Sequence, residues 1–216
     1  MSKLEDLRKE YESRGISESE LDANPFRQFK LWFDDAVARC AADWFEPNAM
    51  SLATSDLNGH VTNRTVLLKH FDDRGFTFFT NYTSEKGRQI SANPHVCLLF
   101  HWHYQGRQIR IDGTAARTSR EISESYFHSR PHGAQIGASL SKQSEVAPPR
   151  AELDRQCQAL TERYRDQPVP LPETWGGYIV TPVRFEFWQG RVDRLHDRFR
   201  YQLVSPNQWR RERLFP

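Results

Sequence analysis

The sequence predicts a mainly β protein of the α+β class, in which antiparallel strands form a closed or partly closed barrel with peripheral helices. Segments rich in β-branched and aromatic residues fill the middle and the end of the chain. Turn signals separate them, and Asn58-Gly59 is the strongest hairpin signal. Helical patterns are few and stand before or between these segments.

The expected elements follow from these patterns. We expect strands over residues 50–55, 60–71, 75–81, 95–104, 107–117, 175–188, 193–204 and 209–214. We expect helices over residues 4–13, 25–44, 84–92, 119–130 and 149–166. The segment Thr118-Ser119-Arg120-Glu121 fits a capping box before the fourth helix, which Pro131 ends. We expect residues 1–20 to be a mobile N-terminal segment and residues 21–216 to be one domain.

Composition and charge exclude several classes of protein. The 216 residues carry 30 Lys and Arg against 28 Asp and Glu, so no strong positive field indicates a nucleic-acid partner. Three cysteines, odd in number, do not form a disulfide framework. No apolar run has the length of a signal peptide core or a membrane span. These features predict a cytoplasmic protein.

Several common site motifs are absent from the chain. It has no dinucleotide-binding glycine fingerprint, no P-loop, no paired-cysteine zinc motif and no nucleophile elbow. Cys97, His101 and His103 would share one strand face, but no fourth ligand accompanies them. We therefore expect ordinary strand residues there and no metal site.

Four segments could instead bind phosphate, and each has a simpler explanation. Residues 64–70 place cations near both ends of an apolar strand, as a barrel strand with solvated ends also would. Residues 80–86 form a hydroxyl-rich helix start with Lys86, or a plain N-cap. Tyr126 and Arg130 share a helix face, as a surface pair would, and Gln143-Ser144 could be a solvated loop.

The segment Phe187-Trp188-Gln189-Gly190-Arg191-Val192-Asp193-Arg194-Leu195-His196-Asp197-Arg198-Phe199 is the most informative part of the chain. If it is a strand, Arg194, His196 and Arg198 point to one face. Because burying such a face without anionic partners is costly, the pattern predicts an anionic ligand beside an aromatic wall.

These motifs together resemble the pyridoxine/pyridoxamine 5′-phosphate oxidase family. The matching segments are RTVLLKH (64–70), FFTNYTSEK (78–86), RQIRIDG (107–113), YFHSRP (126–131), QIGA (135–138), SKQS (141–144) and FWQGRVDRLHDRF (187–199). They run in order over nearly the whole chain, and the last is highly specific. The resemblance implies an FMN-binding split β-barrel, antiparallel, in a homodimer whose FMN sites lie at the subunit interface.

The resemblance also implies a role for each matching residue. The FMN-binding set would be Arg64, Thr65, Val66, Leu67, Leu68, Lys69, Phe79, Thr80, Lys86, Gln108, Gln143, Ser144, Trp188 and Arg198. The substrate-binding set would be Arg8, Tyr11, Lys69, Tyr126, Arg130, Arg194 and His196, where Arg8 and Tyr11 belong to a segment that covers the substrate. Arg194 and His196 would border the pyridine ring as the catalytic pair.

Three residues depart from the family pattern. Glu85 stands where many members have an arginine, Ala134 stands where a serine is common, and Phe79 replaces a common tyrosine. Glu85 adds an anion near the expected flavin phosphate. Loss of one neutral hydrogen bond costs about 0.5–1.5 kcal/mol, so Ala134 predicts weaker substrate binding rather than inactivity.

The function that the resemblance implies is oxidation of pyridoxine 5′-phosphate and pyridoxamine 5′-phosphate by dioxygen. The products would be pyridoxal 5′-phosphate and hydrogen peroxide, with ammonia from the amine. Two alternatives remain open on the sequence: a related split-barrel flavin reductase, and a noncatalytic protein that binds flavin or vitamer phosphate.

Overall fold

A computed structural model describes residues 11, 13–40 and 42–216. The chain divides into two compact units. We call Met1–Leu52, Cys97–Gly113 and Pro182–Pro216 the terminal unit, and Ala53–Val96 and Thr114–Thr181 the central unit. The single domain expected over residues 21–216 and the mobility of residues 1–20 stay predictions. The helix expected over 4–13 lies, except for residues 11 and 13, outside the described residues.

Nine strands in the described residues form one sheet. They are β1 (Ala49–Ser55), β2 (Val61–Leu67), β3 (His70–Asp72), β4 (Gly75–Asn81), β5 (His95–Trp102), β6 (Arg107–Arg117), β7 (Trp175–Gln189), β8 (Asp197–Ser205) and β9 (Gln208–Leu214). The sheet order is β2-β1-β5-β6-β7-β4-β3, while β8 pairs with β7 and β9. The β3–β4, β4–β7, β7–β8 and β8–β9 ladders are antiparallel, as expected.

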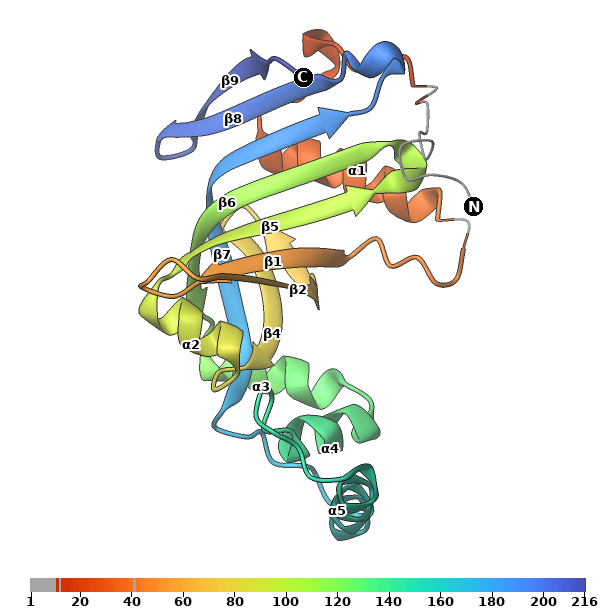
Figure 1. The fold of residues 1–216 in the computed structure, drawn as a ribbon, viewed down its shortest axis with the longest axis vertical. Helices are drawn as coiled ribbons and strands as arrows, with labels where there is room; N and C mark the ends of the chain where they lie inside the picture. The colour runs from red at the N-terminus through yellow and green to blue at the C-terminus, as the bar shows by residue number, and fades with distance from the viewer. Residues whose placement is uncertain (1–10, 12, 41) are drawn as a thin grey trace. The chain divides into compact units, whose positions relative to one another are not determined.

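In the terminal unit, the helix α1 (Pro25–Ala38) packs against strands, and Figure 1 shows it alongside β5 and β6. The side chain of Asn24 caps its start by accepting from the amide of Phe26 at 2.8 Å. The ring of Trp32 meets Phe187 of β7 edge to face at 5.3 Å. The helix ends at Ala38, so the prediction that it extends to residue 44 is wrong. The chain turns there, as the amide of Cys40 donates to Val37 O.

In the central unit, the single strand expected over residues 60–71 is two strands. The amide of Lys69 donates to Thr77 O at 2.9 Å, and His70 then pairs with Thr77 in the β3–β4 ladder. β2 lies next to β1 in the sheet, whereas β3 lies next to β4. The prediction of one continuous strand is therefore wrong, because the chain changes its pairing partner at residues 68–69.

The helices of the central unit are α2 (Glu85–Ala92), α3 (Arg120–Ser129), α4 (His132–Leu140) and α5 (Arg150–Arg163). The N-cap of α3 is Ser119, whose side chain accepts from the amide of Ile122, so a box beginning at Thr118 is one residue too early. α4 was not expected. It packs through Ile136 against Phe127 and Trp175, and Cys157 of α5 borders this core.

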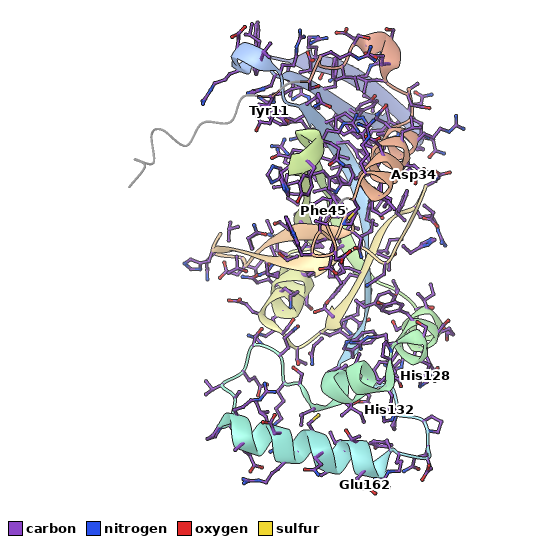
Figure 2. All side chains as sticks on the ribbon, turned by 90° about the vertical axis from the view of Figure 1, so that its right-hand side faces the viewer. Tyr11, Asp34, Phe45, His128, His132 and Glu162 are labelled. Atoms are coloured by element: carbon purple, nitrogen blue, oxygen red, sulfur yellow. The ribbon has the colours of Figure 1, made fainter. Side chains whose placement is uncertain are left out.

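Two histidines tie the helices to the segment that precedes β7. Figure 2 shows His128 and His132 at the turn from α3 into α4. Their Nε2 atoms lie 3.1 Å from Val169 O and Tyr164 O, respectively. The three cysteines of the chain are free thiols.

Short 3₁₀ turns adjoin two of the expected strands, so that one strand ends earlier than expected and the other starts later. η3 (His103–Gln105) follows β5, so the strand expected to reach residue 104 ends at Trp102. η4 (Val192–Arg194) precedes β8, so the strand expected from residue 193 starts at Asp197. A further turn, η2, spans Glu18–Glu20.

Candidate functional site

A cavity of about 880 Å³ lies entirely within the central unit. Its walls come from β2, β4, α2, the end of α3, α4, the loop after α4 and the start of β7. It is lined by these predicted site residues: Arg64, Thr65, Val66, Leu67, Lys69, Phe79, Thr80, Lys86, Tyr126, Arg130, Gln143 and Ser144. Leu68, which was predicted with them, is buried and is not part of the lining.

The charge of this cavity is strongly unbalanced. Four of the lining residues are cationic, namely Arg64, Lys69, Lys86 and Arg130, and one, Glu85, is a carboxylate. Cations that are partly withdrawn from water favour anionic ligands. The cavity is therefore suited to bind anions.

Arg64 is held on β2 by hydroxyl groups. Its Nη1 donates to Thr54 Oγ1 at 2.6 Å, and its Nη2 donates to Thr62 Oγ1. Gln89 of α2 accepts from both threonine hydroxyls through Oε1. Burial lowers the pKa of Arg64, and the nearby carboxylate of Glu85 opposes this shift. These hydroxyl groups help to fix the guanidinium in place.

Lys86 lies in the first turn of α2 and is only 7 % exposed. Its Nζ donates to Gln143 Oε1 at 2.8 Å and to Thr80 Oγ1 and Ser84 Oγ at 3.3 Å. Burial and, to a smaller degree, the charge of Arg64 lower the pKa of Lys86 to about 8, while the carboxylate of Glu85 opposes the shift. The contacts of Nζ within the described part of the chain are all with neutral oxygen atoms.

The loop after α4 brings Gln143 and Ser144 to this helix start. Ser144 has a φ of 74°, and its Oγ accepts from the amide of Glu85 at 3.1 Å. Asn81 Nδ2 donates to Ser141 O at 3.1 Å and holds the loop against the end of β4. The structure therefore joins the predicted segments 80–86 and 141–144. Together with Arg64, whose charge acts on Lys86, we call them the α2 cluster.

A second cluster in the same cavity is aromatic. The ring of Phe79 stacks on Tyr126 with 4.0 Å between centroids and lies nearly parallel to Trp175 at 5.6 Å. The guanidinium carbon of Arg130 lies 5.0 Å from the centroid of the Trp175 ring. Gln135 Nε2 donates to Arg130 O at 2.8 Å and fixes the backbone. We call this the α3 cluster.

The guanidinium of Arg130 is incompletely satisfied. Its Nη1 is buried and has no hydrogen-bond partner in the described residues. Burial lowers the pKa of Arg130, and Tyr126 opposes the shift. A buried, unpaired donor in a cation-lined cavity is satisfied most directly by an anionic acceptor.

The terminal unit contains the other predicted residues that the structure describes, of which Trp188, His196 and Tyr11 form an aromatic cluster. The rings of Trp188 and His196 are 4.7 Å apart, and Tyr11 lies edge-on at 5.5 Å from each. The amide of Arg191 donates to His196 Nδ1 at 3.1 Å, so this nitrogen carries no proton. Burial and then Arg194 lower the pKa of His196, which keeps the ring neutral.

The predicted strand face of Arg194, His196 and Arg198 is wrong for its first two members. Asp193 and Arg194 have left-handed φ values of 55° and 60°, so they form a turn and not a strand. Regular alternation begins at Asp197, which is buried with Phe199 while Arg198 is half-buried. The turn projects Arg194 as an exposed side chain.

Arg198 is already paired within the terminal unit. Its Nε and Nη2 lie 3.0 and 2.8 Å from Glu186 Oε1, and its Nη1 donates to Phe215 O. Arg110 contacts the other oxygen of Glu186 at 3.1 Å. Gln108 lies on β6 of the same unit. Arg8 lies outside the described residues.

Trp175, Glu186 and Asp197 were not predicted as site residues. Trp175 precedes two glycines, and a Cβ on Gly177 would lie 2.8 Å from the Phe79 ring. The two consecutive glycines after Trp175 could have indicated a close contact with an aromatic side chain. The roles of Glu186 and Asp197 depend on partners far away in the sequence, which no local signal shows.

The described residues contain no group of three or more His, Cys, Asp or Glu side chains that could hold a metal ion. None of their helices is long and apolar enough to cross a membrane.

Comparison with solved structures defines the class of protein. The crystal structure of PhzG from Burkholderia lata, in complex with tetrahydrophenazine-1-carboxylic acid, is similar with a TM-score of 0.86 and 28% identity. The match covers 94% of this chain and 98% of that one. A pyridoxamine 5′-phosphate oxidase-related, FMN binding protein from Nostoc punctiforme shares the fold, with a TM-score of 0.72 and 16% identity. The predicted split-barrel fold class is confirmed.

Sequence comparison defines the family. Residues 34–164 match the model described as pyridoxamine 5′-phosphate oxidase, and residues 175–216 match the pyridoxine 5′-phosphate oxidase C-terminal dimerisation region. The chain belongs to the pyridoxamine 5′-phosphate oxidase family, and its prediction as an oxidase enzyme is confirmed at that level. The pyridoxine/pyridoxamine 5′-phosphate oxidase of Rubrobacter xylanophilus is 52% identical over 99% of this chain and 96% of that protein. The enzyme of the same name from Crocosphaera subtropica is 50% identical over 97% and 98%.

Proposed function

We propose that the protein is an FMN-dependent oxidase, which converts pyridoxine 5′-phosphate and pyridoxamine 5′-phosphate to pyridoxal 5′-phosphate. Dioxygen would be reduced to hydrogen peroxide, and the amine substrate would also consume water and release ammonia. The proposal rests on the cavity of the central unit, which is lined by four cationic side chains and one carboxylate. Three of these cations belong to the α2 and α3 clusters, and the proposed reaction brings two phosphate groups together.

The residues present fit FMN. The α2 cluster offers the buried ammonium of Lys86 and the fixed guanidinium of Arg64, both bonded to neutral oxygens. Such a pair can bind a phosphate at a helix N-terminus, where the helix dipole also favours an anion. We propose that it holds the flavin phosphate. Bound FMN would supply the hydride acceptor, and the protein would supply binding and orientation.

The α3 cluster fits the phosphate of the substrate. The unpaired Nη1 of Arg130 needs an acceptor, and the phenol of Tyr126 is held beside it by the ring of Phe79. A guanidinium and a phenol together can bind a phosphate through charge-assisted hydrogen bonds. Lys69, an exposed cation at the rim of the same cavity, would add a third contact.

The turn in the terminal unit fits the ring of the substrate. Because His196 Nδ1 accepts the amide of Arg191, its neutral ring carries the proton on Nε2 and can donate there. The lowered pKa of His196 maintains this state near neutral pH. Arg194 would orient the ring, and Trp188 would form an aromatic wall. We propose that a homodimer completes the site, as the match to a dimerisation region supports.

The test is to load the purified protein with FMN and supply each vitamer phosphate with dioxygen. We expect equal amounts of aldehyde and hydrogen peroxide, with ammonia from the amine alone. Flavin binding without turnover would indicate the noncatalytic alternative. Oxidation of a reduced nicotinamide without vitamer oxidation would indicate a flavin reductase. A protein that takes up no FMN would contradict all three.

A further inference from the structure

We propose that Asp197 is a positioning residue that fastens the N-terminal segment to the turn carrying Arg194 and His196. We call Ser13–Ile16 the anchored segment and Arg191–His196 the substrate turn. The inference rests on the proposed function, because that function makes the turn part of the substrate site. The contacts involved all lie within the terminal unit.

The side chain of Asp197 is 2 % exposed, and each of its two carboxylate oxygens accepts a hydrogen bond. Its Oδ2 accepts the amide of Ile16 at 2.9 Å, and its Oδ1 accepts Arg213 Nη1 at 2.6 Å. A carboxylate has an acceptor at each oxygen, whereas an asparagine must present its amino group to one of the two donors. The position therefore requires an aspartate rather than a group of the same shape.

Asp197 also braces the substrate turn. Arg191 Nη1 lies 3.5 Å from Asp197 Oδ2, while the amide of Arg191 donates to His196 Nδ1. Arg191, the first residue of the turn, is thereby linked both to Asp197, the first residue of β8, and to His196, the last residue of the turn. Left-handed φ values at Asp193 and Arg194 are unfavourable for residues with a Cβ, so such a turn needs contacts that hold it.

The anchored segment approaches Asp197 as closely as a glycine allows. Gly15 has a φ of +85°, and a Cβ there would lie 2.3 Å from Asp197 Oδ2 and 2.6 Å from Arg191 Cδ. Real Cβ atoms do not come so near, so any other residue would push the segment away. Glycine is the residue that permits both this φ and this approach.

The same segment leads to Tyr11, which meets the substrate residues. The Tyr11 ring lies 5.5 Å from both Trp188 and His196, and a Cβ on Gly190 would lie 2.4 Å from it. Figure 2 labels Tyr11. One buried carboxylate thus sets the positions of Tyr11 and of His196 relative to each other. We infer that loss of the anchor weakens substrate binding more than it slows the chemical step.

Two variants break the anchor in different ways. Asp197→Asn removes one acceptor, whereas Gly15→Ala keeps the side chains of Asp197 and Arg191 chemically intact and displaces the segment through the clash of its Cβ with them. Gly59→Ala is the matched control, because Gly59 has a φ of +84° but no atom within 4 Å of its added Cβ. Backbone strain is therefore equal in the two glycine variants, and only Gly15→Ala affects Asp197.

The measurements are amide hydrogen exchange at Ile16, KM and kcat with pyridoxamine 5′-phosphate, and FMN affinity of the holoenzyme. We expect both test variants to raise the Ile16 exchange rate and KM by about tenfold, the effect of losing one hydrogen bond to a charged group. We expect kcat and FMN affinity to change little. Gly59→Ala should match the wild type in all four.

The inference is overturned if Ile16 exchange stays at the wild-type rate in both test variants. It is also overturned if exchange rises while KM does not, because the anchor would then position nothing. If only Asp197→Asn unfolds, Gly15→Ala still decides the question. A wild-type protein that oxidises no vitamer phosphate would refute the proposed function, and exchange at Ile16 would then decide by itself whether Asp197 fastens the segment.

Discussion

The predicted cations of the site differ in the groups that surround them. Arg64 is half-buried and bonded to Thr54 and Thr62, whereas Arg194 is exposed on a turn with a left-handed backbone. A fixed guanidinium in a cavity suits a permanently bound group. An exposed guanidinium beside His196 suits a ligand that enters and leaves at each turnover.

This difference predicts separate effects of two substitutions. Arg194→Ala should lower kcat/KM by roughly tenfold to a hundredfold, as a lost hydrogen bond to a charged group is worth about 1.5–3 kcal/mol. It should leave the flavin content unchanged. Arg64→Ala should instead reduce the flavin bound per mole of purified protein. Equal losses of flavin and activity in Arg194→Ala would contradict the separation, as would full flavin occupancy in Arg64→Ala.

Glu85 opposes the cations of its own cluster. It lines the cavity, and its charge acts on both Arg64 and Lys86. We expect Glu85→Gln to tighten FMN binding by roughly fivefold, since one partly solvated charge interaction is worth up to about 1 kcal/mol. Titration of the apoprotein with FMN, followed by flavin fluorescence, measures this.

The control for Glu85 is Glu121→Gln, because Glu121 also lies in the first turn of a helix but not in the cavity. It should leave FMN affinity unchanged. The gain from Glu85→Gln should shrink as salt is added, because salt screens the repulsion. Unchanged or weaker FMN binding in Glu85→Gln would show that Glu85 does not oppose the phosphate.

At the scale of elements, we expect α2 and the loop after α4 together to make FMN binding pH-dependent. They bury Lys86 and lower its pKa to about 8, so the free protein loses this charge as the pH rises through that value. A bound phosphate stabilises the ammonium and raises the pKa again. Binding is therefore strongest below the pKa of the free protein and weakens above it.

We accordingly expect FMN affinity to fall between about pH 7 and pH 9.5, a range in which the phosphate itself stays a dianion. Lys86→Met should bind FMN more weakly and show little change over the same range. Equilibrium titrations at several pH values measure both. A fall of equal steepness in Lys86→Met would assign the pH dependence to another group.

Elements with local signals were predictable from sequence, and elements set by distant contacts were not. Asn58-Gly59 and the N-cap Ser84 lie within their own turns, and the ends of β1, β2 and α2 that adjoin them lie within about one residue of the expected bounds. The turn η4 was read as strand because its alternation was misleading. The turn leads into Asp197, whose partners Ile16 and Arg213 are remote in sequence and are not indicated by the alternation.

In the candidate site, too, some features were predictable from the sequence and others depend on contacts between distant residues. Arg64, Lys86 and Gln143, which the resemblance assigns to FMN binding, all line the cavity, and their contacts with FMN stay predictions. The resemblance did not indicate the hydrogen bonds that bury Lys86. It did not show that Arg198 is already paired with Glu186, because alternation along a strand does not identify its cross-strand partner. Residue types were thus predictable, whereas their states of charge and pairing required the fold.

At the scale of the whole molecule, the candidate residues are distributed over two units. Arg64, Lys86 and Arg130 belong to the central unit, and Arg194 and His196 belong to the terminal unit. The matched dimerisation region covers residues 175–216, which includes the substrate turn. We expect each complete site to combine the central unit of one subunit with the terminal unit of the other.

Mixing two impaired variants tests this arrangement. Coexpressed Arg64→Ala and Arg194→Ala chains, with different tags, yield a heterodimer that can be purified by both tags. If each site uses two chains, a two-fold symmetric heterodimer has one doubly altered site and one intact site, and should recover about half of the wild-type activity. If each site lies within one chain, both sites carry a substitution and the heterodimer stays as impaired as its parents. The FMN content is a control that does not distinguish the two arrangements, because Arg64→Ala impairs one flavin site per heterodimer in either case. Restored turnover at the remaining flavin is the result that shows that a partner supplies Arg194.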